Sequence, residues 1–100
     1  MTSQDPADDN ASEDLATRRK RLYFRSWHRG IKEADILLGN FADKYLASLT
    51  ADQLDRYEDL IQEQDVDIIA WITGSQPPPK RFDTDVMQLL QKLDYVELTS

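Results

Sequence analysis

The stretch "LTADQLDRYEDLIQEQD" at residues 49–65 carries the clearest helix signal in the chain. Thr50 is a favourable N-cap, and Gln53 follows three residues later, which is the spacing of a capping box. The apolar side chains behind this cap recur at helical spacing and would share one face: Leu54, Tyr57, Leu60 and Ile61. We therefore predict an amphipathic helix that buries this face against neighbouring helices.

Helical patterns continue towards the C-terminus. "DVDIIAWITG" predicts a short helix with Asp65 as its N-cap and Gly74 as its stop. The three prolines of "SQPPPK" then predict a stiff extended connector, because proline is not tolerated in a helix interior. Asp83 or Thr84 opens a last helix, whose apolar residues fall at helical spacing: Val86, Leu89, Leu90 and Leu93.

Two more helices are predicted before residue 49. The first runs from about residue 14 to 28 and the second from about 31 to 46, with Gly30 at a left-handed position between them. Gly39 interrupts the apolar pattern of the second helix, and we interpret it as a point where a neighbouring helix approaches closely. Since no segment alternates with period two for long enough to form a strand, the predicted fold class is all-α, a compact five-helix bundle.

The composition predicts a single small domain. The chain has 100 residues, a net charge of -7 and no cysteine. Residues 1–14 are acidic and poor in apolar side chains, which predicts a disordered tail ahead of a five-helix domain at residues 15–97. Trp27 and Trp71 are expected in its core. The lack of cysteine and the single histidine argue against a disulfide framework, a thiolate metal site and a zinc cluster based on histidine.

The chain carries no membrane or targeting signal that we recognise. No apolar run approaches the roughly 20 residues of a membrane span. The N-terminus lacks the apolar segment of a secretory signal and the arginine-rich, acid-poor composition of a mitochondrial transit peptide. We therefore expect a cytoplasmic, bacterial protein that does not insert directly into a membrane.

Basic residues are concentrated in one short strip. Seven of the twelve lysines and arginines fall between residues 18 and 32: Arg18, Arg19, Lys20, Arg21, Arg25, Arg29 and Lys32. In an otherwise acidic chain this strip predicts a directed docking surface for an acidic partner. We do not expect nucleic acid as the partner, because the rest of the body would repel it.

The segment "RSWHRGIKE", residues 25–33, concentrates polar chemistry within that strip. His28, Glu33 and Asp35 are of the residue types that serve in acid–base catalysis. However, the sequence contains neither a nucleophile motif nor a Gly-rich phosphate loop, so we do not predict an enzyme. The simpler interpretation is a histidine at a helix end followed by acids that complement the dipole at a helix start.

At Arg29-Gly30-x-x-Glu33 the chain resembles the SdhE-type succinate dehydrogenase assembly factors, which are flavinylation factors with an RGxxE motif. The resemblance covers about residues 18–93. It includes "RSWHRGIKEAD" and the segment "LLGNFADKYLASLTADQLDRYEDLIQEQDVDIIAWITG" that follows. It implies a five-helix fold, in agreement with the periodicity, but it does not account for the acidic tail.

The resemblance implies a function in assembly. Such factors bind the flavoprotein subunit of succinate dehydrogenase, and in some bacteria that of fumarate reductase, and they promote covalent attachment of FAD to a histidine of that subunit. The factor would stabilise a competent conformation, would hold no cofactor of its own, and would act on the FAD of its partner. We expect a monomer. A second interpretation is an antitoxin-like regulatory protein that binds a cytoskeletal or other protein target.

The resemblance also implies a partner-binding site at the junction of the first two helices. Arg29 would present its planar guanidinium to the partner, and Gly30 would let a partner backbone approach. Glu33, one turn further on, would accept hydrogen bonds from the same side. Flanking positions complete the expected site: Arg25, His28 and Asp35, the last as an orienting residue. Pairing of Arg29 with Glu33 is the structural alternative for this motif.

Overall fold

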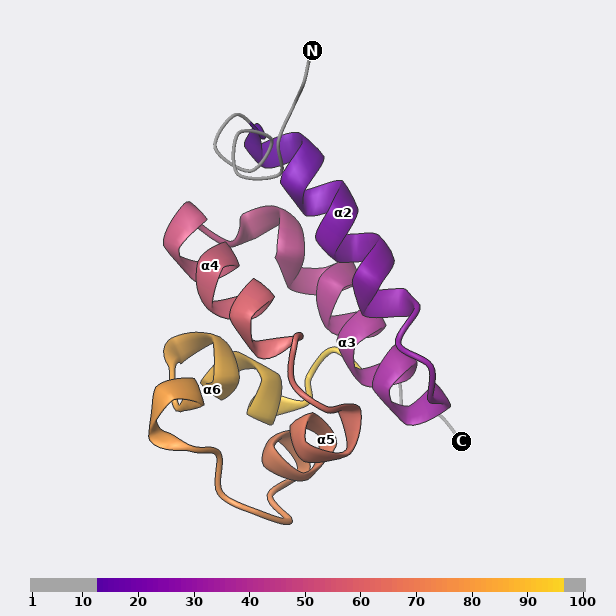
Figure 1. Ribbon diagram of the computed structural model, residues 1–100, viewed down its shortest axis with the longest axis vertical. Helices are drawn as coiled ribbons and strands as arrows, with labels where there is room; N and C mark the ends of the chain where they lie inside the picture. Colours follow the sequence, from indigo (N-terminus) through magenta and orange to yellow (C-terminus); the bar gives the residue numbers. More distant parts are fainter. Residues whose placement is uncertain (1–12, 97–100) are drawn as a thin grey trace.

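The computed structural model describes residues 13–96, and the described part is helical with no β-strand. Its elements, in chain order, are α2 (Leu15–Trp27), α3 (Lys32–Tyr45), the 3-10 helix η1 (Leu46–Ser48), α4 (Ala51–Leu60), α5 (Asp65–Thr73), the 3-10 helix η2 (Lys80–Phe82) and α6 (Asp85–Lys92). Figure 1 shows α2 and α3 as an antiparallel pair, with α4, α5 and α6 packed beside them. The predicted all-α fold with five α-helices is confirmed.

Local capping explains where most of these helices begin. The Asp14 carboxylate accepts a hydrogen bond from the Thr17 backbone N–H at 2.8 Å and so caps α2. Both halves of the predicted capping box at Thr50 and Gln53 are present at the start of α4. The prediction of Asp65 as an N-cap is wrong, because the capping position of α5 is one residue earlier and Asp65 is the first helical residue. The Asp65 carboxylate accepts a hydrogen bond from Arg29 and does not cap the helix.

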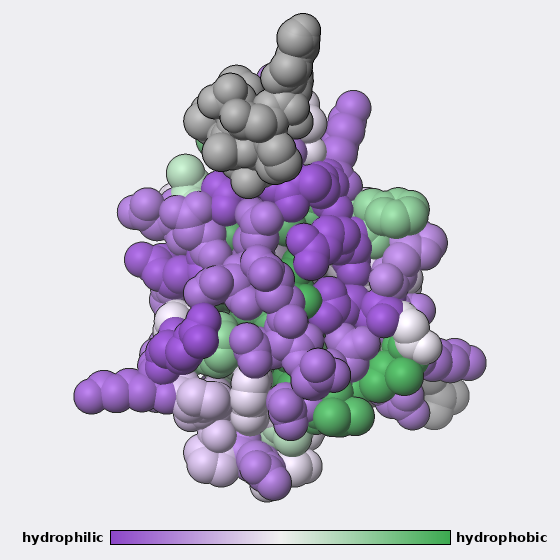
Figure 2. Space-filling view, in the orientation of Figure 1, coloured by the Kyte–Doolittle hydropathy of each residue, from purple (hydrophilic) through white to green (hydrophobic). Residues whose placement is uncertain are grey.

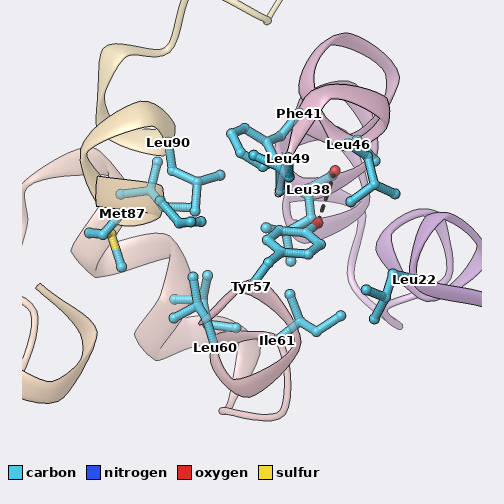
Figure 3. Close-up of a cluster of buried hydrophobic side chains, with 14 of the residues drawn as sticks. Leu22, Leu38, Phe41, Leu46, Leu49, Tyr57, Leu60, Ile61, Met87 and Leu90 are labelled. Atoms are coloured by element: carbon cyan, nitrogen blue, oxygen red, sulfur yellow. Dashed lines mark hydrogen bonds between the residues drawn. The ribbon is translucent and has the colours of Figure 1, made fainter. Parts of the chain in front are cut away.

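The core draws on every α-helix. Its largest fully buried side chains are Tyr57, Phe41, Leu22, Leu38, Leu54, Ile61, Ile68, Met87, Leu90 and Val86. Figure 3 shows several of them converging on the ring of Tyr57, which stacks on Phe41 at 5.4 Å between ring centroids. The predicted inner face of α4 is confirmed, since its four apolar residues are all buried.

A buried polar contact joins three helices inside this core. Ser26 on α2 donates its hydroxyl proton to the Leu22 carbonyl oxygen at 2.7 Å, and its Oγ lies 2.6 Å from the Tyr57 hydroxyl oxygen. The Tyr57 hydroxyl also lies 3.5 Å from the Leu38 carbonyl oxygen on α3. Burial raises the pKa of Tyr57, so the hydroxyl stays neutral at physiological pH. The contact therefore fixes α2, α3 and α4 relative to one another without a buried charge.

At Gly39 a side chain of α2 approaches the backbone of α3 closely, as the sequence suggested. A Cβ atom at this position would overlap ring atoms of Trp27. Trp27 itself is only half-buried rather than in the core, whereas Trp71 is buried as predicted. The indole ring of Trp27 thus occupies the space that a side chain on α3 would otherwise fill.

Gly39→Ala is therefore expected to destabilise the fold by about 1–3 kcal/mol, because the helices or the indole must move to relieve the overlap. Urea unfolding followed by circular dichroism would measure the loss. In the background of Trp27→Leu, which removes the indole, the same substitution should cost clearly less. Equal losses in both backgrounds would show that the Trp27 contact does not determine the requirement for glycine.

The predicted domain boundaries are only partly within the described residues. Residues 1–12 and 97–100 lie outside them, and the disorder predicted for residues 1–12 stays a prediction. Glu13 and Asp14, which were assigned to the tail, make defined contacts. Glu13 forms an ion pair with Arg21 at 2.8 Å, and Asp14 is the cap of α2.

Candidate functional site: the turn between α2 and α3

Residues 28–31 connect α2 to α3 and contain the conformation that requires a glycine. Gly30 has φ +114°, a region that side chains of L-amino acids rarely adopt. A Cβ atom there would meet nothing within 4 Å, so the requirement comes from the backbone and not from a lack of space. The positive φ predicted for Gly30 is confirmed.

The Arg29 side chain points into the molecule. Its Nε donates to Asp65 Oδ1 at 2.9 Å, and its Nη2 donates to the Ile61 carbonyl oxygen at 2.6 Å. The side chain is only 9% exposed. The expectation that Arg29 presents its guanidinium to a partner at the surface is therefore wrong. The guanidinium instead bridges a carbonyl at the C-terminal end of α4 and a carboxylate at the N-terminal end of α5. The cation is favourable at the end of α4, and the Asp65 carboxylate is favourable at the start of α5.

Asp35 fixes the same turn from the side of α3. Its Oδ1 accepts a hydrogen bond from the Arg29 backbone N–H at 2.6 Å. The Asp35 backbone N–H bonds in turn to the Ile31 carbonyl oxygen at 3.1 Å. Asp35 is thus placed to orient the backbone of the turn. The alternative pairing of Arg29 with Glu33 does not occur, because Arg29 pairs with Asp65.

The outward side of the turn leaves polar groups free. Glu33 is exposed in the first turn of α3 and has no ion-pair partner among residues 13–96. The exposed ring of His28 stacks on Phe24, with 4.0 Å between the ring centroids. Arg25 is half-buried on the preceding turn of α2. The six residues expected at the site therefore divide into an inward group, Arg29 and Asp35, and a group at the surface.

Two apolar side chains at this junction were not recognised from the sequence as part of the site. Ile31 is 37% exposed beside Gly30, and Val66 is 67% exposed beside the Asp65 that binds Arg29. Figure 2 shows an apolar patch on this face where α5 lies next to the α2–α3 turn. The exposure of Val66 could have been predicted from the sequence, because a helical projection places it opposite the buried stripe of α5.

Much of the basic strip is bound within the molecule. Arg18 pairs with Asp55 at 2.7 Å and with Glu58 at 2.9 Å, and Arg21 pairs with Glu58 at 2.8 Å. Arg19 donates to the backbone carbonyl oxygens at both ends of a short segment, at 3.2 Å for Leu46 and 2.7 Å for Leu49. Arg18, Arg21 and Arg29 are thus paired with carboxylates inside the molecule, and the interpretation of the strip as a docking surface is wrong for these three arginines.

These ion pairs also set the charge of Glu58. Partial burial alone would raise its pKa, but hydrogen bonds from Arg21 and Arg18 outweigh that effect and hold the pKa below its ordinary value. Glu58 is thus ionised at neutral pH and holds α2 against α4. Arg18, Arg19 and Arg21, in the first two turns of α2, therefore stabilise the fold through contacts within the molecule.

Two further properties concern the described part of the chain only. Across residues 13–96, no three histidine, aspartate or glutamate side chains lie close enough together to hold a metal ion. No helix in that range combines the length and the apolar character needed to cross a bilayer.

Comparison with known proteins gives a consistent assignment. The sequence model of a family described as flavinator of succinate dehydrogenase matches residues 20–94. The chain is 48% identical over 82 residues to succinate dehydrogenase assembly factor 2-A, mitochondrial, of Drosophila ananassae, covering 80% of this chain and 53% of the relative. It is 46% identical over 81 residues to the corresponding 2-B protein of Drosophila mojavensis, covering 79% and 52%.

These relatives correct one expectation. They are named as mitochondrial proteins and come from eukaryotes, which overturns the expectation of a cytoplasmic bacterial protein. The chain spans about half the length of the curated relatives that it matches. The family match covers the RGxxE turn, all of α3 to α6 and most of α2. The chain therefore belongs to the Sdh5 family, the flavinators of succinate dehydrogenase.

Proposed function

We propose that this chain binds the flavoprotein subunit of succinate dehydrogenase and promotes covalent attachment of FAD to a histidine of that subunit. Membership of a flavinator family supports this class of function. The chain would act as an assembly factor and not as an enzyme, because the flavoprotein itself supplies both the histidine and the flavin. No cofactor need stay bound to the chain between rounds of assembly.

The observation that carries this proposal is the division of the RGxxE turn into a fixed inner side and a free outer side. Asp35 accepts a hydrogen bond from the backbone of the turn at 2.6 Å, and the Arg29 side chain joins the turn to Ile61 and Asp65 through three contacts of 2.6–2.9 Å. Glu33 and His28 remain exposed on the surface that this backbone supports. A partner that docks here would not have to order the turn, which reduces the entropic cost of binding.

The composition of the junction suits a protein partner. The apolar side chains of Ile31 and Val66 are exposed, and the polar residues His28 and Glu33 lie within three positions of Ile31 along the chain. Protein interfaces commonly combine an apolar centre with a polar rim. Arg29 would contribute as a positioning residue for this surface, while Glu33 would accept hydrogen bonds from the flavoprotein.

Binding alone can promote a reaction in the partner. A ligand shifts a conformational equilibrium by its difference in affinity for the two states, and about 1.4 kcal/mol of difference changes the populations tenfold. Holding the flavin ring and the histidine in a reactive orientation removes an entropic part of the barrier. The chain would therefore accelerate flavinylation by preferring the flavoprotein conformation in which the two groups are aligned.

The test uses the purified apo-flavoprotein subunit of succinate dehydrogenase from the same organism. It is incubated with FAD with and without the full chain, and covalent flavin is measured by fluorescence in a denaturing gel. We expect faster and more complete labelling with the chain, together with co-purification of the two proteins. Equal labelling in both reactions would refute the proposal, and capture of a cytoskeletal protein in place of the flavoprotein would favour the antitoxin-like alternative.

A further inference from the structure

A second surface, separate from the RGxxE turn, has the properties of a binding groove. An open trough of about 530 Å³ runs between α2 and the end of α3 with η1. Its floor and walls are largely apolar, and its lining includes Tyr23, Phe24, Ala42, Leu46 and Ala47. Grooves of this size hold several side chains of a bound ligand.

The two aromatic side chains in the wall of this groove are exposed. Phe24 is 62% exposed and Tyr23 is 44% exposed. Both lie on α2 beside apolar floor residues, so together they form a continuous apolar surface and not isolated exposed residues. The Phe24 ring also stacks on His28, which connects the groove to the RGxxE turn.

The charges around the groove indicate which partner would fit. Arg19 and Lys20 line one part of it, and no carboxylate among residues 13–96 lies within 4 Å of either of them. Asp43, the acidic residue of the lining, has its Oδ1 3.4 Å from Trp27 Nε1, and this neutral N–H donor leaves the charge of the carboxylate in place. The two cations outnumber this carboxylate, so the lining carries a net positive charge on a chain whose net charge is -7.

We propose that this groove binds a short segment of the flavoprotein subunit that carries an apolar side chain next to a carboxylate. The apolar side chain packs between Phe24 and the floor at Leu46, and the carboxylate pairs with Lys20. This inference rests on the proposed function, because it names a second contact with the same partner. The RGxxE turn and the groove would then hold the flavoprotein at two adjacent places.

The test measures the affinity of full-length variants for the apo-flavoprotein subunit by calorimetry. Phe24→Asp is expected to weaken binding by at least about 10-fold, as for other aromatic residues at interface centres. Ala47→Glu, which changes the groove at η1 without touching the Phe24–His28 stack, should weaken binding similarly. Lys20→Glu should weaken it by several-fold at low salt and by less at high salt, because salt screens exposed charges.

Matched controls carry the same changes elsewhere. Leu15→Asp places the same new charge on α2 outside the groove, and Lys92→Glu reverses an exposed charge on α6. Both should bind as the unsubstituted chain does. If that chain does not bind the flavoprotein, the proposed function fails. If it binds and the three groove variants bind equally well, the proposed function stands and the groove inference is overturned.

Other occupants of the groove give different results. A second copy of this chain would show as a dimer in light scattering that Phe24→Asp dissociates. The chain's own N-terminal residues would show as amide shifts in residues 1–12, beyond those around residue 24 itself, when Phe24→Asp is compared with the unsubstituted free protein. Either result, with unchanged affinity for the flavoprotein, would refute the inference.

Discussion

Arg29→Met is expected to lower the free energy of unfolding by about 2–3 kcal/mol, because it removes one partner of a largely buried charge pair. The substitution leaves the Asp65 carboxylate, 18% exposed, without its partner and the Ile61 carbonyl oxygen without its donor. Methionine keeps the apolar stem of the side chain, so the loss reports on the guanidinium. Urea unfolding monitored by circular dichroism gives the measurement.

Arg25→Met is the matched control for this prediction. Arg25 lies one turn earlier on α2, is half-buried, and has no ion-pair partner among the described residues, so its loss should cost no more than about 0.5 kcal/mol. A double-mutant cycle of Arg29→Met with Asp65→Asn should give a coupling energy of about 1 kcal/mol or more. Coupling near zero would mean that the contact does not contribute to stability.

The same pair decides how Arg29 acts in flavinylation. If Arg29 positions the turn, Asp65→Asn should reduce covalent flavin in parallel with Arg29→Met, measured where both variants are folded. If Arg29 instead leaves Asp65 to contact the flavoprotein directly, Asp65→Asn should label normally or better, because it releases the arginine. The two outcomes separate a positioning residue from one that touches the partner.

Local sequence chemistry predicted the helices well. The Thr50–Gln53 capping box and the positive φ of Gly30 each depend on residues within a few positions of one another. The close approach at Gly39 was also foreseen, because a glycine inside an amphipathic helix needs a reason in packing. Such short-range rules were sufficient to define the fold class.

Long-range pairing was not predictable in the same way. Arg29 reaches Asp65, 36 positions away, and Arg18 reaches Glu58, 40 positions away. A row of arginines on one helix looks the same in sequence whether it faces solvent or the acids of another helix. The spacing identified the stripe, but only the placement of α4 beside α2, and of α5 beside the turn that follows α2, determines which guanidinium groups are bound within the fold.

Gly30 also illustrates a limit of the motif as a functional probe. At φ +114° any side chain strains the backbone by about 1 kcal/mol or more, although the space beside it is open. A loss of flavinylation in a Gly30 variant would therefore mix a changed turn with a lost contact. Glu33 gives the cleaner test.

Glu33→Gln is expected to reduce covalent flavin by at least about 10-fold at limiting chain concentration, while the free energy of unfolding falls by no more than about 1 kcal/mol. The expected loss of stability is small because it reflects only the interaction of an exposed acid with the first turn of α3. The expected loss of covalent flavin is large because the Glu33 carboxylate would accept hydrogen bonds from the flavoprotein, and charge-assisted bonds are about twice as strong as neutral ones.

Asp52→Asn is the control that isolates this effect. Asp52 is likewise an exposed acid in the first turn of a helix, α4, and its change removes the same charge from an equivalent position. Both variants should lose similar stability, but only Glu33→Gln should lose flavinylation and affinity for the apo-flavoprotein subunit. Full labelling with Glu33→Gln would reduce Glu33 to a residue that stabilises the start of α3. The docking surface would then have to rest on His28 and on the apolar residues Ile31 and Val66.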